Sequence, residues 1–181
     1  MKFLSQTFVV AKFALITLLA LVAIGMLIDP KHEFTTDVMI AAPPADVWNV
    51  LTDEPGFAEW GVFIEGIAGP LVAGQSIKVT LNSASADRMT FEPTVLVMKP
   101  NEELRWRGRV ALPNVFDGEH WFTLEPTAAG TRVIHGERFD GILVPLFPMD
   151  VFKADFERFN AALKARVESL VDTSAAVPTG G

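Results

Sequence analysis

Residues 120–139 read HWFTLEPTAAGTRVIHGERF, two runs of alternating residues separated by a short turn at 127–130. Alternation with a period of two predicts two strands, and the short turn predicts that they pair as an antiparallel hairpin. Such a turn sets the cross-strand partners: His120 with Glu137, Phe122 with His135, and Leu124 with Val133. One face of this hairpin therefore gathers two histidines and a glutamate among aromatic side chains.

The chain before the hairpin shows the same period of two. Strands are predicted over residues 34–41, 77–81, 91–97 and 104–110, and Pro93 indicates an edge or a bulge. Pro44 suits the first turn of a short helix ending near residue 51, and one further turn is predicted over residues 57–60. The order of elements is a strand, short helices and then an antiparallel meander.

After the hairpin the period changes to that of an amphipathic helix of about 20 residues. Its apolar stripe consists of Phe152, Phe156, Phe159, Leu163, Val167 and Leu170. A single long helix after a run of antiparallel strands favours an α+β fold, in which a curved sheet wraps around the C-terminal helix.

Composition excludes several classes of function. The chain has 181 residues, of which 15 are basic and 22 acidic, and it carries a formal net charge of −7. No basic patch is visible, so we expect no nucleic-acid partner. The chain contains neither cysteine nor tyrosine. Thiolate chemistry, disulfides, cysteine-ligated metals and phenolic acid–base catalysis are therefore excluded.

The N-terminal 30 residues form a separate hydrophobic segment. Residues 13–28 carry no charge and contain only Thr17 as a polar side chain. As a helix they would extend about 24 Å, against a hydrocarbon core of about 30 Å. The leading interpretation is a single membrane-spanning anchor, with Lys2 and Lys12 keeping the N-terminus cytoplasmic and the following domain outside. A cleaved signal peptide, releasing a secreted protein, and a buried soluble helix are the alternatives.

Several short motifs, in this order and spacing, resemble those of SRPBCC proteins. They cover roughly residues 34–170. The opening motif runs from Ile40 to Trp48, followed by Leu51-Thr52-Asp53 and Trp60. The later ones are Leu104-x-Trp106-x-Gly108, Gly118-Glu119-His120-x-Phe122, Gly130-Thr131-Arg132, Glu137-x-Phe139-x-Gly141 and Phe156-x-x-x-Asn160-x-x-Leu163-Lys164.

The SRPBCC superfamily includes START-type lipid carriers, pollen-allergen-like proteins and polyketide cyclase/dehydrase-like proteins. The resemblance implies the helix-grip fold: about seven antiparallel strands gripping a long C-terminal helix, with an apolar cavity between them. It does not choose among reactions, because one fold hosts many functions. The residues expected to line the cavity are Trp60, Phe91, Trp106, His120, Phe122, His135, Glu137, Phe139, Phe152, Phe156 and Phe159.

His120, His135 and Glu137 admit three interpretations. They are a structural cross-strand set, or they orient the polar end of an apolar ligand, or they act as acid–base or metal-binding groups. His120 and Glu137 are the candidate catalytic residues in the last case. The spacing matches no established metal motif, so we predict neither a metal site nor a cofactor.

Two further stretches stand out in the sequence. Residues 141–149, GILVPLFPM, are apolar with two prolines. They form either a buried plug at the end of the sheet or a lid over the cavity that faces a membrane. Arg105, Arg107 and Arg109 share one strand face, which indicates solvated charge at a sheet edge or, alternatively, an anion site.

Three hypotheses about the function remain open. The leading hypothesis is a membrane-anchored domain that binds a hydrophobic small molecule or lipid. The alternatives are a cyclase/dehydrase-type enzyme using His120 or Glu137, and a protein-interaction module of the envelope without a ligand. We expect the anchor or signal segment over residues 1–30, the helix-grip domain over 31–171 and a disordered tail over 172–181.

Overall fold

The computed structural model describes residues 10–17, 20, 30–84, 87–110 and 112–176. Residues 10–17 are helical, and no helix within the described parts of the chain is long and apolar enough to cross a membrane. Most of the segment predicted as an anchor or signal, residues 1–9, 18–19 and 21–29, lies outside the described residues.

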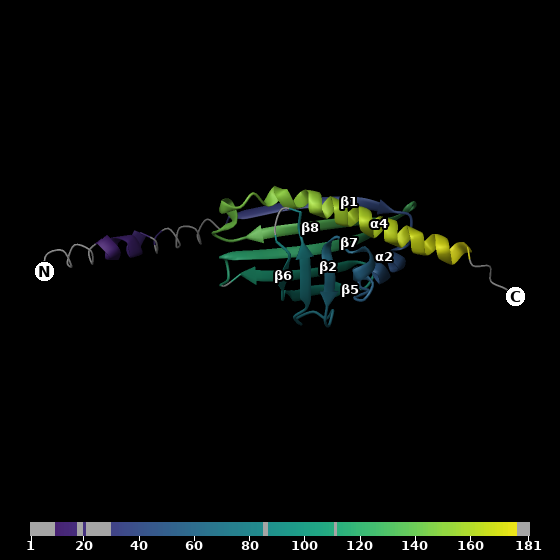
Figure 1. Ribbon diagram of the computed structural model, residues 1–181, viewed down its shortest axis with the longest axis horizontal. Coiled ribbons are helices and arrows are strands. Elements are labelled where there is room, and N and C mark those ends of the chain that lie inside the picture. The colour runs from purple at the N-terminus through teal and green to yellow at the C-terminus, as the bar shows by residue number, and fades with distance from the viewer. Residues whose placement is uncertain (1–9, 18–19, 21–29, 85–86, 111, 177–181) are drawn as a thin grey trace.

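In the part of the chain that the structure describes, eight strands form two antiparallel sheets, and a long helix crosses them (Figure 1). The larger sheet has the order β1-β8-β7-β6-β5, with strands β1 (Lys31–Ile40), β5 (Thr94–Lys99), β6 (Glu103–Val110), β7 (Phe116–Thr127) and β8 (Gly130–Asp140). The smaller sheet comprises β2 (Phe63–Ala68), β3 (Lys78–Asn82) and β4 (Met89–Phe91). The helices are α2 (Pro44–Leu51), α3 (Phe57–Trp60), η1 (Val144–Leu146), η2 (Met149–Phe152) and α4 (Lys153–Ala176).

This architecture is the predicted α+β helix-grip fold, with the curved sheet divided at Pro93. Proline has no backbone N–H, so a strand is interrupted there. The Pro93 carbonyl still accepts a hydrogen bond from Ile77 N at 2.9 Å, and Val95 N donates to Gln75 O at 2.9 Å. A bridge between Ser76 and Thr94 thus links the two sheets.

The predicted hairpin register is confirmed. In the β7–β8 pair, His120 faces Glu137 and Phe122 faces His135. Gly130 lies in the turn with φ +125°, a conformation that favours glycine. The register fixes which side chains of β7 and β8 point toward α4, because a slip of one residue would turn one strand's set to the other face.

Helix α4 supplies the centre of the core. Phe156, Phe159, Leu163 and Val167 are each at most 1% exposed, and the helix packs on β1, β2 and β8. Leu170, expected in the same stripe, is 44% exposed, because the end of α4 extends past the sheet (Figure 1). The helix continues through Ala176, so the first five residues of the expected tail are helical; residues 177–181 lie outside the described chain.

The arginine face of β6 lies within the sheet and not at its edge. Glu119 on β7, whose side chain is 7% exposed, pairs with Arg105 at 2.7 Å, with Arg138 at 3.2 Å and with Arg107. Arg109 pairs with Asp117 at 3.0 Å. Because neighbouring carboxylates match these guanidinium groups, the arrangement is an ion-pair network on the outer face of the sheet, and the anion-site alternative is not supported.

Candidate functional site

A cavity of about 200 Å³ lies between the two sheets, beside the N-terminal half of α4. Its walls are mostly apolar and come from β2, β3, β4, β6, β7, β8, η2 and α4. The lining residues are Phe63, Leu81, Ser83, Asp87, Met89, Phe91, Trp106, Gly108, Arg109, Val110, Phe116, Gly118, His120, Glu137, Phe139, Phe152 and Phe156. An apolar cavity of about 150 Å³ can hold benzene, whereas drug-sized ligands need roughly 300 Å³ or more. The described volume suits one small ring system or the end of a longer molecule.

Two glycines that face each other across β6 and β7 help to keep this space open. Gly108 pairs with Gly118, and both line the cavity. A Cβ on Gly118 would lie 2.7 Å from Glu137 Oε1, and a Cβ on Gly108 would lie 3.0 Å from Phe91 Cε2. A side chain at either position would therefore occupy the cavity or displace its wall.

A continuous chain of hydrogen bonds runs from the cavity wall into the core. Glu137 Oε2 lies 2.5 Å from His120 Nδ1, and His120 Nε2 lies 2.9 Å from His135 Nε2. His135 Nδ1 lies 2.9 Å from Asn160 Oδ1. Asn160 Nδ2 donates to Thr36 Oγ1 at 2.9 Å. Every ring nitrogen of both histidines is engaged in this chain.

Aromatic rings hold the two imidazoles in place. His120 stacks on Trp106 with centroids 4.5 Å apart and planes within 6°. His135 is fully buried and stacks on Phe156 at 3.9 Å and on Phe122 at 4.3 Å. Both side chains are thus fixed in orientation as well as in position.

The order of donors along the chain can be worked out from its inner end. The Asn160 oxygen accepts, so His135 Nδ1 carries a proton; the Phe156 carbonyl, one helical turn earlier, also accepts from this ring. Neutral His135 then accepts at Nε2, which requires a proton on His120 Nε2. Neutral His120 accepts at Nδ1, so the proton in its hydrogen bond to the glutamate belongs to Glu137.

Burial favours the same uncharged state. It raises the pKa of Glu137 to about 8, with a smaller contribution from the Glu119 carboxylate. It also lowers the pKa of His120 to about 3 and that of His135 well below its usual range. An ionised group without full solvation is costly in such surroundings. At neutral pH the Glu137 carboxylic acid is therefore hydrogen-bonded to neutral His120, which is in turn hydrogen-bonded to neutral His135.

Seven of the residues expected to line the cavity do so: Phe91, Trp106, His120, Glu137, Phe139, Phe152 and Phe156. Four others do not line it. Trp60 packs between Phe57 and Phe159 with centroids 4.8 and 5.3 Å away. Phe122, Phe159 and His135 are fully buried. These four fill the core because Phe159 on α4 packs against Trp60, Phe122 and His135. The alternation of single strands does not reveal this packing between layers.

Sequence reasoning did not assign Asn160, Thr36 or the two facing glycines to the site. Asn160 carried a signal, because it is a polar residue four positions after Phe156 on the apolar face of α4. Ser83 and Asp87 reach the cavity from the segment between β3 and β4, and Met89 reaches it from the start of β4. The sequence pattern gave no sign of these positions.

Comparisons with known proteins agree with this geometry. The family model described as polyketide cyclase / dehydrase and lipid transport matches residues 31–168. No curated protein matches the chain significantly in sequence.

Solved structures share the fold at low sequence identity. An aromatase/cyclase from a Streptomyces species has a TM-score of 0.63 and 19% identity, covering 82% of this chain and 100% of its own. A Chromobacterium violaceum protein gives a TM-score of 0.57 and 21% identity over 75% of this chain and 97% of its own. The structure of Ara h 8.0201 has a TM-score of 0.57 and 16% identity, and the match covers 77% of this chain and 99% of its own.

Proposed function

Because the chain belongs to the polyketide cyclase / dehydrase and lipid transport family, within the SRPBCC superfamily indicated by its motifs, we propose that it binds a hydrophobic small molecule or part of a lipid. The observation that carries this proposal is an apolar cavity whose wall holds the Glu137–His120 pair. Apolar walls with a few placed polar groups are the usual form of a ligand site. The walls would desolvate the ligand, and Glu137 Oε1, the carboxyl oxygen that does not bond to His120, would accept a hydrogen bond from a hydroxyl at its polar end.

Two measurements test ligand binding. Mass spectrometry of an organic extract of natively purified protein should show a stoichiometric apolar compound. Calorimetric titration with 2-naphthol should show saturable binding, and naphthalene, which lacks the hydroxyl, should bind more weakly. The proposal fails if the extract is empty and neither probe binds.

Filling the cavity supplies a matched control. Gly108→Leu should weaken 2-naphthol binding at least about tenfold, because the new side chain takes the ligand's place; tenfold corresponds to about 1.4 kcal/mol. Gly66→Ala, on the smaller sheet with no atom within 4 Å of the added Cβ, should bind like the wild type. Equal binding by all three proteins would show that the probe sits elsewhere.

The same hydrogen bond supports a second candidate, a cyclase/dehydrase-type enzyme. Glu137 Oε1 can accept a proton from a substrate carbon while the proton on Oε2 moves along the hydrogen bond to His120 Nδ1, and the two groups line the same cavity. General acid–base catalysis contributes about 10²–10⁴-fold to a rate. Deuterium exchange at the central carbon of acetylacetone, a dicarbonyl, should then be accelerated by the protein and lose about that factor in His120→Gln. A binding protein would show no acceleration.

We also propose that the N-terminal segment holds the domain at a membrane, with the domain on the extracytoplasmic side. The support is the uncharged apolar run of residues 13–28, preceded by two lysines. The full chain should stay with the membrane fraction after alkaline carbonate extraction. A soluble protein whose N-terminus begins near Ala23-Ile24-Gly25 would instead establish a cleaved signal peptide.

A further inference from the structure

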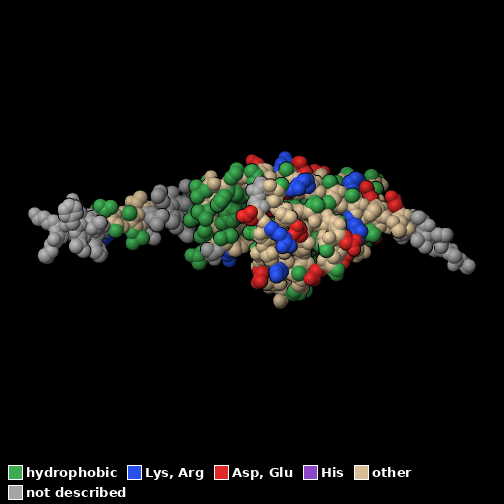
Figure 2. All heavy atoms as spheres, viewed as in Figure 1, with side chains coloured by type: hydrophobic (Ala, Val, Ile, Leu, Met, Phe, Trp, Pro, Cys, Tyr) green, Lys and Arg blue, Asp and Glu red, His purple; other side chains and the backbone are tan. Residues whose placement is uncertain are grey.

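One end of the domain exposes a group of large apolar side chains, here called the apolar end. Figure 2 shows hydrophobic side chains gathered at one end of the domain, on the left in this view. The exposed residues come from the end of β6 and from the connection between β8 and α4, with exposures between 44% and 72%: Val110, Leu112, Leu146, Phe147 and Val151. Large contiguous apolar patches on a protein surface mark interaction sites.

Backbone hydrogen bonds tie the segments of the apolar end together. Ile142 N donates to Asn114 O, and Leu143 N donates to Val115 O, each at 3.1 Å. Gly141 N donates to Pro30 O at 3.0 Å. The last bond holds Pro30, the described residue that begins the domain, beside this surface.

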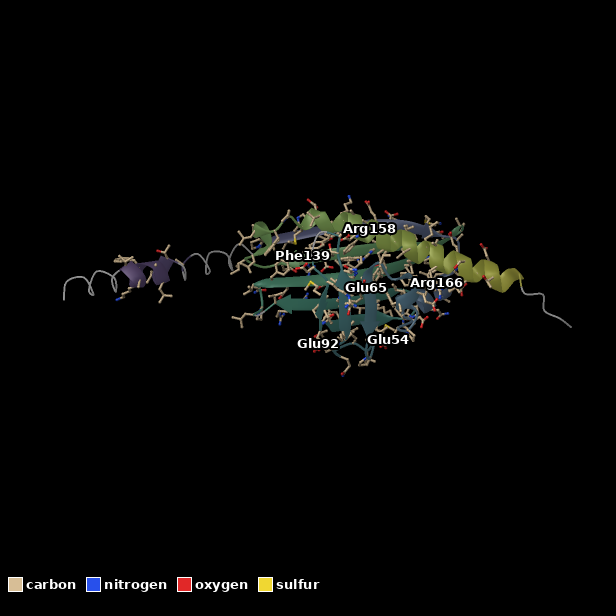
Figure 3. All side chains as sticks on the ribbon, in the orientation of Figure 1. Glu54, Glu65, Glu92, Phe139, Arg158 and Arg166 are labelled. Atoms are coloured by element: carbon tan, nitrogen blue, oxygen red, sulfur yellow. The ribbon has the colours of Figure 1, made fainter. Side chains whose placement is uncertain are left out.

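The apolar end is continuous with the cavity. Val110 belongs to the patch and also lines the cavity. Phe116 lines the cavity and meets Phe147 edge-on with ring centroids 5.5 Å apart. Phe139, labelled in Figure 3, lies toward this end, and its ring packs against that of Phe116 with centroids 5.5 Å apart. A molecule entering between these side chains would pass from the apolar end directly into the cavity.

Two of the charged side chains beside the patch have partners of the opposite kind. Arg109, next to Val110, is paired with Asp117. Asp150, next to Val151, lies 3.1 Å from His32 on β1. A surface of this kind gains little from anionic headgroups, which attract clusters of lysine and arginine. Its affinity would come from burying aliphatic and aromatic side chains at the boundary of headgroups and acyl chains.

We propose that the apolar end docks on a lipid bilayer and brings the mouth of the cavity to the membrane surface. Pro30, which follows the apolar run in the sequence, is held at this face by its bond with Gly141, and the exposed side chains match the chemistry of the acyl boundary. Docking does not depend on the identity of the ligand. Transfer of the ligand between bilayer and cavity rests on the proposed function.

Spin labels on single cysteines test the docking, since the chain contains no cysteine of its own. The full chain would carry Leu112→Cys, Leu146→Cys or, as the matched control, Leu170→Cys. Leu170 is also apolar and 44% exposed but lies near the opposite end of α4. Each nitroxide-labelled protein is reconstituted into phosphatidylcholine vesicles. Collisions with oxygen, which concentrates in lipid, are compared with collisions with a water-soluble nickel chelate.

In the vesicles, labels at residues 112 and 146 should collide more often with oxygen and less often with the nickel chelate than the label at residue 170, which should behave as a water-exposed site. The proposal is overturned if all three labels stay water-like, or if all three shift together. Protection of 112 and 146 from both agents only in the presence of cell extract would indicate a protein partner and also overturn it. If the N-terminal segment proves to be cleaved, the same labels are read on the released protein mixed with vesicles. Binding of 2-naphthol is measured separately, so failure of docking and failure of ligand binding are distinguishable.

Discussion

Glu137 and the two histidines make stability depend on pH in opposite directions. Folded Glu137 keeps its proton up to pH about 8, whereas its ordinary pKa is 4.5, so the folded state holds an extra proton between these values. Stability from this group therefore falls as pH rises through that range. His120 and His135 stay neutral when folded but protonate near pH 6.5 when unfolded, so their contribution falls as pH drops below 6.5. Together the three groups favour a stability maximum near pH 6.5.

Glu137→Gln should remove the loss on the alkaline side. The amide still donates to His120 Nδ1 but does not ionise. Between pH 6.5 and 8 the variant should therefore retain about 1–2 kcal/mol of unfolding free energy that the wild type loses. Urea unfolding at pH 6.5, 7.25 and 8 measures this difference in slope. Glu54→Gln, in an exposed turn, should keep the wild-type slope. Parallel slopes for Glu137→Gln and the wild type would mean that Glu137 is already ionised at pH 6.5.

His135→Leu tests whether the inner chain is a structural requirement. Leucine fills much of the space between Phe122 and Phe156 but leaves His120 Nε2–H and Asn160 Oδ1 without partners. Each unsatisfied buried group costs about 1–3 kcal/mol, so unfolding should become easier by about 2–5 kcal/mol. Thr36→Val, which breaks the chain at its end, should cost about half as much in the same urea titration. If His135→Leu left the free energy of unfolding unchanged, the core would have to relax around His120 and Asn160 so that both regain partners.

At the scale of elements, β7 and β8 are held together on the outer face by Trp121 lying across Gly136. A Cβ at Gly136 would overlap the Trp121 indole. The Arg105 guanidinium covers the same ring, with its Cζ 5.0 Å from the ring centroid. Gly136→Ala should therefore displace Trp121 and destabilise the protein by about 1–3 kcal/mol, the usual range for overpacking. Thermal unfolding and a red shift of tryptophan emission would report it. Gly66→Ala is the control and should be neutral or stabilising by up to about 1 kcal/mol; a similar loss in both variants would contradict the steric cause.

At the scale of the whole molecule, the core belongs to the domain after Pro30. The buried residues of the described chain lie between Thr36 and Val167. A chain of residues 31–176 should therefore unfold cooperatively at the same thermal midpoint as the full chain in detergent. Calorimetry of the two proteins tests this domain boundary. A lower midpoint for the shorter chain would mean that residues before 31 contribute to the core.

Local pattern predicted much of this molecule. The alternation of residues 120–139 and the turn at 127–130 determined the β7–β8 register and hence the meeting of His120 with Glu137, because side chains on paired strands follow a strict period of two. The stripe on residues 152–167 determined which face of α4 is buried, since helical positions three and four apart share a face. The same residues carried the family resemblance.

Only the tertiary structure decided which buried aromatic residues face a cavity and which fill the core. Phe122 and Trp106 have similar sequence environments, yet α4 closes over the first and the smaller sheet leaves space beside the second. Likewise Asn160, Thr36 and His135 are far apart in sequence and become one hydrogen-bonded chain through the packing of α4 on β1 and β8. Strand period specifies the face of a side chain, whereas a cavity, and the direction of protons along a buried chain, depend on what the opposite layer supplies.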